Sequence, residues 1–253
     1  MVRQQYAWRR SAFLLPCNAT MVSSGGLISL GTGKLACWAG GFCSSFINVS
    51  ADVSCTDFSA STDYSMGERY STHTLPLNRK FVVGFVSAAW TFLAIRGSGY
   101  WKVLTQIELT TRPDGILNTS PTTAILPIYY RRVGVQQVHV IQMIDADSTD
   151  ILRCRWATSN SLNNSNGYDE CGSICSPSLP SFTLFPNNCT LVYTITAWNY
   201  YAVALQIEDF YNSLSTTPLS SVPLQFIFYG MNTPGGCAVP PLIIGIRPHQ
   251  GLI

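Results

Sequence analysis

The sequence is poor in charged residues. Asp, Glu, Lys and Arg make up 11% of the 253 residues, whereas about 25% is usual for a soluble domain. The formal net charge is only +2, so electrostatics gives no reason to expect nucleic acid or an anionic membrane as a partner. The surface must instead be covered by neutral polar side chains, by glycan or by other protein.

Long apolar runs are also missing. No run approaches the roughly 18–20 residues that a membrane-spanning helix needs, so we predict no membrane span. The apolar stretch at residues 12–15 is shorter than the about 7–15 residues at the centre of a signal peptide. If the protein is secreted, we expect this numbering to describe a mature chain whose leader is gone.

Catalytic motifs are absent as well. The glycines near residues 31–34 and 97–99 lack the spacing of a phosphate-binding loop and of a nucleophile elbow. The three histidines, His73, His139 and His249, have no metal-binding spacing, and no pair among the 13 acidic residues stands out. We therefore predict a protein that is not an enzyme and has no catalytic residues.

Cysteines and glycosylation sequons are, by contrast, frequent. The chain has nine cysteines, and none forms the C-x2-C pairs that are typical of zinc sites. Cysteines and sequons together indicate an oxidising, secretory environment, although a chance excess of sequons is the alternative. We predict a secreted or surface-exposed protein with N-glycans at Asn18, Asn48, Asn118, Asn163 and Asn188, and disulfides among Cys17, Cys37, Cys43, Cys55, Cys154, Cys171, Cys175 and Cys189.

Strand patterns dominate the chain. Apolar and polar residues alternate at 103–110, 191–196, 201–208 and 224–229, which is typical of half-buried antiparallel strands. Turn residues separate them at short intervals, and no amphipathic helix exceeds two turns. We predict an all-β fold of two tandem antiparallel β-sandwich domains, stapled by disulfides and with strand-like terminal extensions.

A domain boundary is predicted in a segment rich in Pro, Gly and Thr. It leaves four cysteines before it and five after it, so Cys237 is predicted to be free or to bond across domains or chains. The pairing itself does not follow from the sequence. The predicted parts are an N-terminal extension at 1–18, a sandwich at 19–112, a linker with a first strand at 113–126, a second sandwich at 127–240 and a C-terminal extension at 241–253.

The second half resembles a known family. Its segment W198-NYYAVALQIEDF-Y211 is similar to the penultimate strand of immunoglobulin-like modules of the cadherin and PKD kind. The segment VHVIQMIDADSTDILRCRWA resembles their earlier hairpin, in which an Asp-rich turn precedes a strand that carries a Trp. The resemblance covers residues 118–245 and extends to extracellular surface proteins of invertebrates; it implies an immunoglobulin-like second domain with a disulfide packed against an indole. Residues 1–117 resemble nothing that we can name.

The Asp-rich turn raises the question of calcium. Cadherin-like modules place carboxylates at such turns, and Asp145 and Asp147 are the candidates. The sequence has neither an EF-hand loop nor the full cadherin ligand set, and aspartates are common in turns because they cap their own backbone. We therefore predict no metal and no other cofactor, with calcium at Asp145 and Asp147 as the alternative.

The ends of the chain give the leading functional hypothesis. Both are apolar and strand-like, so each can add a strand to the open sheet of another copy, and such head-to-tail contacts propagate into a filament. The alternative is that each end packs on its own domain. The predicted function is a structural or adhesive glycoprotein that polymerises with itself. The predicted assembly residues are Val2, Tyr6, Trp8, Phe13 and Leu15 at one end and Leu242, Ile243, Ile244 and Ile246 at the other.

Two other functions remain open. Exposed aromatic rings stack on sugars in carbohydrate-binding modules, and candidate platforms lie at 100–101, 129–130 and 198–201. Adjacent aromatic residues on a strand face opposite sides, so one ring of each pair must point outward. The chain can also be one module of a larger receptor ectodomain.

Overall fold

The computed structural model describes residues 1–11, 17–29, 33–39, 49–88, 90–94, 99–147, 149–175, 179 and 181–232. Within these ranges the regular structure is almost all β-strand, which confirms the predicted all-β class. The one α-helix of the described part, α1 (Ala19–Ser24), is shorter than two turns. No helix there is long and apolar enough to span a membrane.

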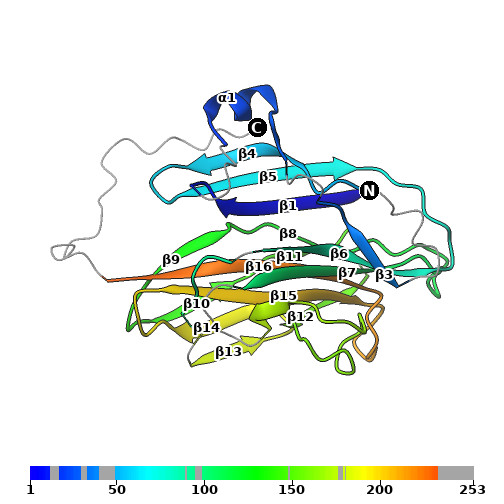
Figure 1. Cartoon of the computed structure of the whole chain (residues 1–253). Coiled ribbons are helices and arrows are strands. Elements are labelled where there is room, and N and C mark those ends of the chain that lie inside the picture. The colour runs from blue at the N-terminus through cyan, green and yellow to red at the C-terminus, as the bar shows by residue number, and fades with distance from the viewer. Residues whose placement is uncertain are drawn as a thin grey trace, which may run out of the picture.

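The strands form three stacked layers (Figure 1). The upper layer is an antiparallel sheet in the order β1 (Val2–Arg9), β5 (Tyr64–Ser71), β4 (Val53–Ser59) and β2 (Leu27–Ile28). The middle sheet has the order β12 (Ile151–Trp156), β15 (Tyr200–Phe210), β16 (Ser220–Met231), β7 (Tyr100–Glu108), β6 (Lys80–Ala88) and β3 (Ala36–Ala39), and β9 (Ile128–Arg132) also pairs with β16. The lower sheet is β10 (Gln136–Val140), β14 (Thr190–Thr194) and β13 (Phe182–Phe185), and β8 (Thr122–Thr123) pairs with β11 (Met143–Ile144).

The second half of the chain is an immunoglobulin-like sandwich. The sheet β10–β14–β13 faces β12–β15–β16, which corresponds to the two sheets of that fold. Tyr193, Phe226 and Phe228 are fully buried between them. The disulfide between Cys154 and Cys189 belongs to the same core, with Trp156 packed against it. The two facing sheets agree with the sandwich that the resemblance implies for this half.

Among the named strands of the described residues, one pair is parallel and departs from the predicted antiparallel arrangement. Strand β9 runs parallel to β16, with Ile128 opposite Ile227 and Arg132 opposite Met231. The N-terminal part of β16 lies instead beside β7, through the pair Ser221 and Gln106. One long strand thus has two neighbours on the same edge.

The middle sheet contains strands from both sides of the predicted linker at 113–126. Beyond the single backbone pair, side chains join β7 to the strands of the second half. The buried Gln206 donates to the carbonyl of Leu104 at 3.2 Å, and Thr105 donates to the carbonyl of Ser221 at 3.0 Å. Gln225 donates to the carbonyl of Lys102 at 2.6 Å. The division into two domains stays a prediction; these bonds show that the two halves share one sheet.

Three disulfides of the described residues each lie within one half of the chain. Cys17 bonds to Cys55 in the first half, and Cys154–Cys189 and Cys171–Cys175 form in the second. Cys37 is also disulfide-bonded, while Cys43 and Cys237 lie outside the described residues.

The N-terminal strand packs on its own chain. β1 pairs with β5 along its whole length, from Val2 opposite Ser71 to Arg9 opposite Tyr64. Val2 and Tyr6 pack against the core of the first half, and Trp8 packs against the cluster around the Cys17–Cys55 disulfide. The N-terminal end therefore follows the alternative prediction, in which each end of the chain packs on its own domain. Phe13, Leu15, Leu242, Ile243, Ile244 and Ile246 lie outside the described residues.

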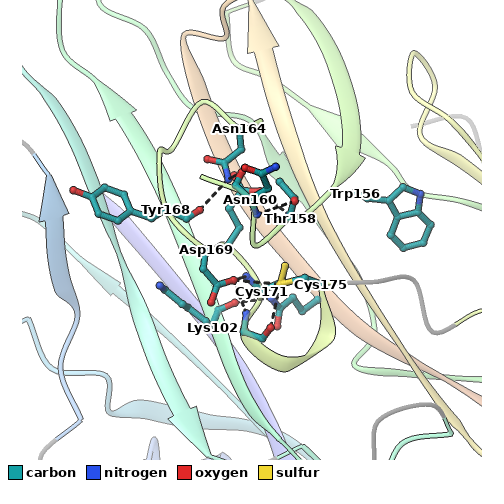
Figure 2. Close-up of a disulfide and its surroundings, with 12 residues drawn as sticks. Lys102, Trp156, Thr158, Asn160, Asn164, Tyr168, Asp169, Cys171 and Cys175 are labelled. Atoms are coloured by element: carbon teal, nitrogen blue, oxygen red, sulfur yellow. Dashed lines mark hydrogen bonds between the residues drawn. A yellow bond between two sulfur atoms is a disulfide. The ribbon is translucent and has the colours of Figure 1, made fainter. Parts of the chain in front are cut away.

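A disulfide loop covers the outer face of β15. The loop packs Cys171 and Ile174 on Ala202 and Ala204, whose small side chains leave room for it. Figure 2 shows the turn closed by Cys171–Cys175, where the Asp169 carboxylate accepts the backbone N–H groups of Cys171 (3.2 Å) and Gly172 (3.0 Å). Because both cysteines are oxidised, their sulfurs are not thiolate ligands for a metal.

Buried charges hold this loop down. Arg155 on β12 forms two 2.7 Å bonds to Glu170 in the loop and a 2.9 Å ion pair with Glu208 on β15. Glu170 is fully buried, so its charge depends on Arg155 for compensation. This network holds the loop on the face of β15 to which Tyr200 of the candidate site also belongs.

Candidate functional site

A row of three tyrosines crosses neighbouring strands of the middle sheet. Tyr200 on β15 lies opposite Tyr229 on β16, and Tyr229 lies opposite Tyr130 on β9. Residues opposite each other on paired strands project from the same face. The ring centroids are accordingly 4.6 Å apart for Tyr200 and Tyr229, and 5.4 Å apart for Tyr229 and Tyr130.

The row faces away from the sandwich core because of strand alternation. Tyr129 points inward, with its ring 4.4 Å from that of His139, whereas its neighbour Tyr130 is 41% exposed. Tyr201 is buried, and its hydroxyl donates to the carbonyl of Ala197. One ring of each adjacent pair thus points outward, as expected from the sequence.

Trp198 extends the row beyond the end of β15. It is 67% exposed, and its indole N–H donates to the hydroxyl of Tyr229. That hydrogen bond orients a large apolar ring which remains in contact with solvent. Together, Tyr130, Trp198, Tyr200 and Tyr229 are called the aromatic platform below.

The third candidate platform is not part of this arrangement. Trp101 is packed into the core of the first half, with its ring 5.3 Å from Phe85. Tyr100 is 46% exposed, and its hydroxyl donates to Asp169 at 3.4 Å. The structure therefore unites two of the three platforms that the sequence suggested.

Charged groups of the first half act on the aromatic platform. Burial is the largest cause that raises the pKa of Tyr200, and the charges of Arg9 and Asp63 add smaller and opposite effects. Arg9 pairs with Asp63 at 2.9 Å, and Ser11 donates its backbone N–H to the same carboxylate at 2.8 Å. These hydrogen bonds lower the pKa of Asp63, with that from the Ser11 side chain contributing most. Exposed rings with a charged rim can hold a ligand that has both an apolar face and hydroxyl groups.

The phenols of Tyr130 and Tyr200 remain neutral near physiological pH. Burial is the largest cause that raises the pKa of both Tyr130 and Tyr200. Each hydroxyl is therefore available both to donate and to accept a hydrogen bond.

The calcium candidates lie in a separate cluster at the linker. Asp145, Asp150 and Asp209 each place an oxygen within 4.8 Å of the others. Arg112 contacts Asp150 at 2.6 Å and Asp147 at 3.1 Å, so part of the negative charge is already neutralised. Calcium stays a hypothesis for this cluster.

The same cluster fastens the linker to the second half. Asp209 is fully buried and accepts hydrogen bonds from the side-chain N–H of Asn118 at 2.6 Å and from the backbone N–H of Ser220 at 2.6 Å. Thr119 donates its backbone N–H to Asp147 at 2.6 Å and its hydroxyl to Asp145 at 3.1 Å. Burial raises the pKa of Asp209 to about 6.

The predicted glycosylation sites have different surroundings. Asn18, Asn163 and Asn188 are exposed, and Asn18 caps α1 by accepting the N–H of Met21. Asn118 instead points into the aspartate cluster, and its carbonyl oxygen is buried. Asn48 lies outside the described residues.

The histidines show no shared site. His139 lies in the sandwich core, where burial lowers its pKa to about 4. His73 bonds to Ser71 at 2.8 Å, and His249 is outside the described part of the chain. The absence of enzymatic activity stays a prediction.

Sequence reasoning missed Tyr229, Arg9 and Asp63. The alternation in 224–229 implied that Tyr229 points away from the core, but only the register with β15 and β9 shows which rings are its neighbours. Arg9 and Asp63 reach the platform through contacts between distant segments, which no local pattern reveals.

Comparison with known proteins concerns mainly the first half. Residues 1–110 match the family model described as integrin beta-like protein A-E, N-terminal. This is the part of the chain for which the sequence offered no resemblance, and the match ends before the immunoglobulin-like half. No curated protein matches the chain.

Among solved structures, the sialic acid binding region of a Streptococcus sanguinis SK1 adhesin, bound to 3'sLn, is similar to this chain. The two share 12% identity over 58% of this chain and 38% of that one, with a TM-score of 0.28. A likeness this slight carries no argument about the ligand of this chain.

Proposed function

We propose that the chain is an extracellular part of an integrin beta-like adhesion protein, and that its aromatic platform binds carbohydrate. The carrying observation is the row of tyrosines extended by an indole that is 67% exposed. The family match at residues 1–110 supports a role in adhesion. The disulfides support an extracellular location.

The chemistry of the aromatic platform suits a sugar. A pyranose ring has an apolar face of C–H groups, which can cover an aromatic ring, and hydroxyl groups at its edge. Trp198 and Tyr130 offer exposed rings, and the ion pair of Arg9 with Asp63, whose charges act on Tyr200, offers a donor and an acceptor. Stacking would supply affinity, and the polar rim would select among sugars.

The head-to-tail filament is less well supported. Strand β1 already pairs with β5 in its own chain, so donating it to another copy would first break that ladder. An adhesive role does not need this exchange, and we therefore prefer carbohydrate binding.

A glycan array probed with the purified native protein tests the proposal. Loss of one stacking ring costs about 1–2 kcal/mol, so Trp198→Ala and Tyr130→Ala should each weaken binding by roughly 5–30-fold. Tyr70→Ala is the matched control, because Tyr70 is a 56% exposed ring on β5 that does not belong to the aromatic platform. An array without hits, or equal loss from Tyr70→Ala, would overturn the proposal.

A further inference from the structure

The sequon at Asn188 lies in a rigid hairpin turn between β13 and β14. Phe185 and Thr190 are paired in register at the mouth of the turn. Cys189 has a left-handed backbone with φ of 46° and is fixed by its disulfide to Cys154. The side-chain oxygen of Asn188 accepts the N–H of Thr190 at 3.2 Å, which orients the exposed amide.

Uncovered apolar side chains surround this asparagine. Phe185 is 49% exposed, and Val140 on β10 is 51% exposed in the same row, because Thr190 lies opposite both of them. A hollow of about 440 Å³ next to the turn is lined by Val140, Ile151 and Asn188 among others. The sequon thus sits beside an apolar surface that the described part of the chain leaves in contact with water.

We propose that Asn188 carries an N-glycan whose first N-acetylglucosamine packs on the ring of Phe185 and stabilises the hairpin. The sugar presents C–H groups and an acetyl methyl group, so covering the ring removes apolar surface from water. Asn188 follows Phe185 by three residues across a reverse turn, which brings the attachment point back toward the ring. The occupant is therefore tethered to the surface that it covers.

The modification is a substitution at C1 of the sugar. The side-chain nitrogen of Asn188 forms a bond to C1 of a lipid-pyrophosphate-linked oligosaccharide, while the bond from C1 to the pyrophosphate oxygen breaks. The lipid pyrophosphate leaves with the bonding electrons, and one amide proton passes to a base of the secretory glycosyltransferase. No oxidation or reduction takes place.

The other described sequons lack this arrangement. The residues three positions before Asn18, Asn118 and Asn163 are Leu15, Gly115 and Asn160, none of which is aromatic. Only the turn at Asn188 has an exposed ring in register with the sequon threonine among these sites.

The test separates the effect of the sugar on thermal stability from the effects of the side chains. The wild-type chain and Phe185→Thr are each produced in a eukaryotic secretory host and in the bacterial periplasm, which forms disulfides but adds no such glycan. Peptide mass spectrometry gives occupancy at Asn188, and thermal unfolding gives Tm for the four proteins. Trimming to a single N-acetylglucosamine gives a fifth.

We expect the glycan to raise the Tm of the wild type by about 2–4 °C more than that of Phe185→Thr, as for one contact in a domain of this size. The trimmed protein should keep the whole increment, and Asn188→Gln in the secretory host should lose it, whereas Asn163→Gln should retain it. An unmodified Asn188, or equal glycan effects with and without Phe185, would overturn the inference.

Discussion

Protonation of Asp209 should stabilise the folded chain, because burial of this side chain disfavours its ionised form. Burial raises the pKa of this carboxyl from 3.8 to about 6 in the folded protein. The folded state therefore holds the proton more tightly than the unfolded state, and the protein gains stability as the pH falls from about 6 towards 4. Above pH 6 this contribution is absent, because the ionised carboxylate is buried at a cost.

The size of the effect follows from the same two values. The difference between 3.8 and about 6 corresponds to about 3 kcal/mol, at about 1.36 kcal/mol per pH unit. Asp209→Asn removes the titration and keeps an acceptor for the N–H of Ser220. The new amide N–H faces the N–H of Asn118, so the Asn118 amide must turn over, which then pairs its carbonyl oxygen, buried without a partner in the wild type, with the new donor. The variant should be more stable than the wild type by up to about 3 kcal/mol at pH 7 and equal to it near pH 4.

Urea unfolding of both proteins between pH 4 and pH 8 measures this difference without adding salt. Other groups in the cluster also titrate, since burial raises the pKa of Asp145 and Asp150 beside Arg112, Asp114 and Asp147. Subtracting the variant from the wild type at each pH largely removes their contribution. A stability difference that stays constant across this range, or that favours the wild type at pH 7, would refute the reasoning.

Three other predictions concern single residues. His139 should change stability with pH in the opposite direction, because burial lowers its pKa to about 4. Its contribution to folding stability, about 3 kcal/mol, is present above pH 6.5 and is lost as the pH falls to 4. His139→Gln should abolish this pH dependence in the same urea series. Gly230→Ala should lower stability by about 1–3 kcal/mol, because the added Cβ would lie 2.3 Å from the carbonyl oxygen of Ala197; thermal unfolding measures this, and an unchanged Tm would contradict it. Asn118 should be unmodified in the folded protein because its amide is packed against Asp209, and peptide mass spectrometry showing full occupancy there would contradict this.

Local alternation predicted three of the long strands, β7, β15 and β16, but not β4, β5 or β6. The repeats at 201–208 and 224–229 fall within β15 and β16, and they also determine that Tyr201 and Phe228 face the core. Alternation cannot show which strands are neighbours, because pairing depends on contacts between segments far apart in the sequence. The continuation of the middle sheet from β16 into β7 therefore had no local signal.

The candidate site was predictable to the same extent. Adjacent aromatic residues at 129–130 and 200–201 required one outward ring each, and the structure bears this out for Tyr130. That the two outward rings meet through Tyr229 follows from the parallel pairing of β9 with β16, which departs from the expected antiparallel arrangement. The aromatic platform is thus a product of register, and no sequence motif encodes it.

The scarcity of charge takes on a further meaning in the folded chain. Several of the few charged residues are buried in networks that fasten loops, including Arg112 with Asp150 and Arg155 with Glu170. Those charges do nothing to solvate the surface, so the surface is poorer in charge than the composition suggests. Solvation of the surface must then come largely from neutral polar side chains, to which glycan at the predicted sequons would add. A weakly charged surface also places little electrostatic restriction on a partner, which is compatible with the proposed recognition of a neutral sugar by stacking and hydrogen bonds.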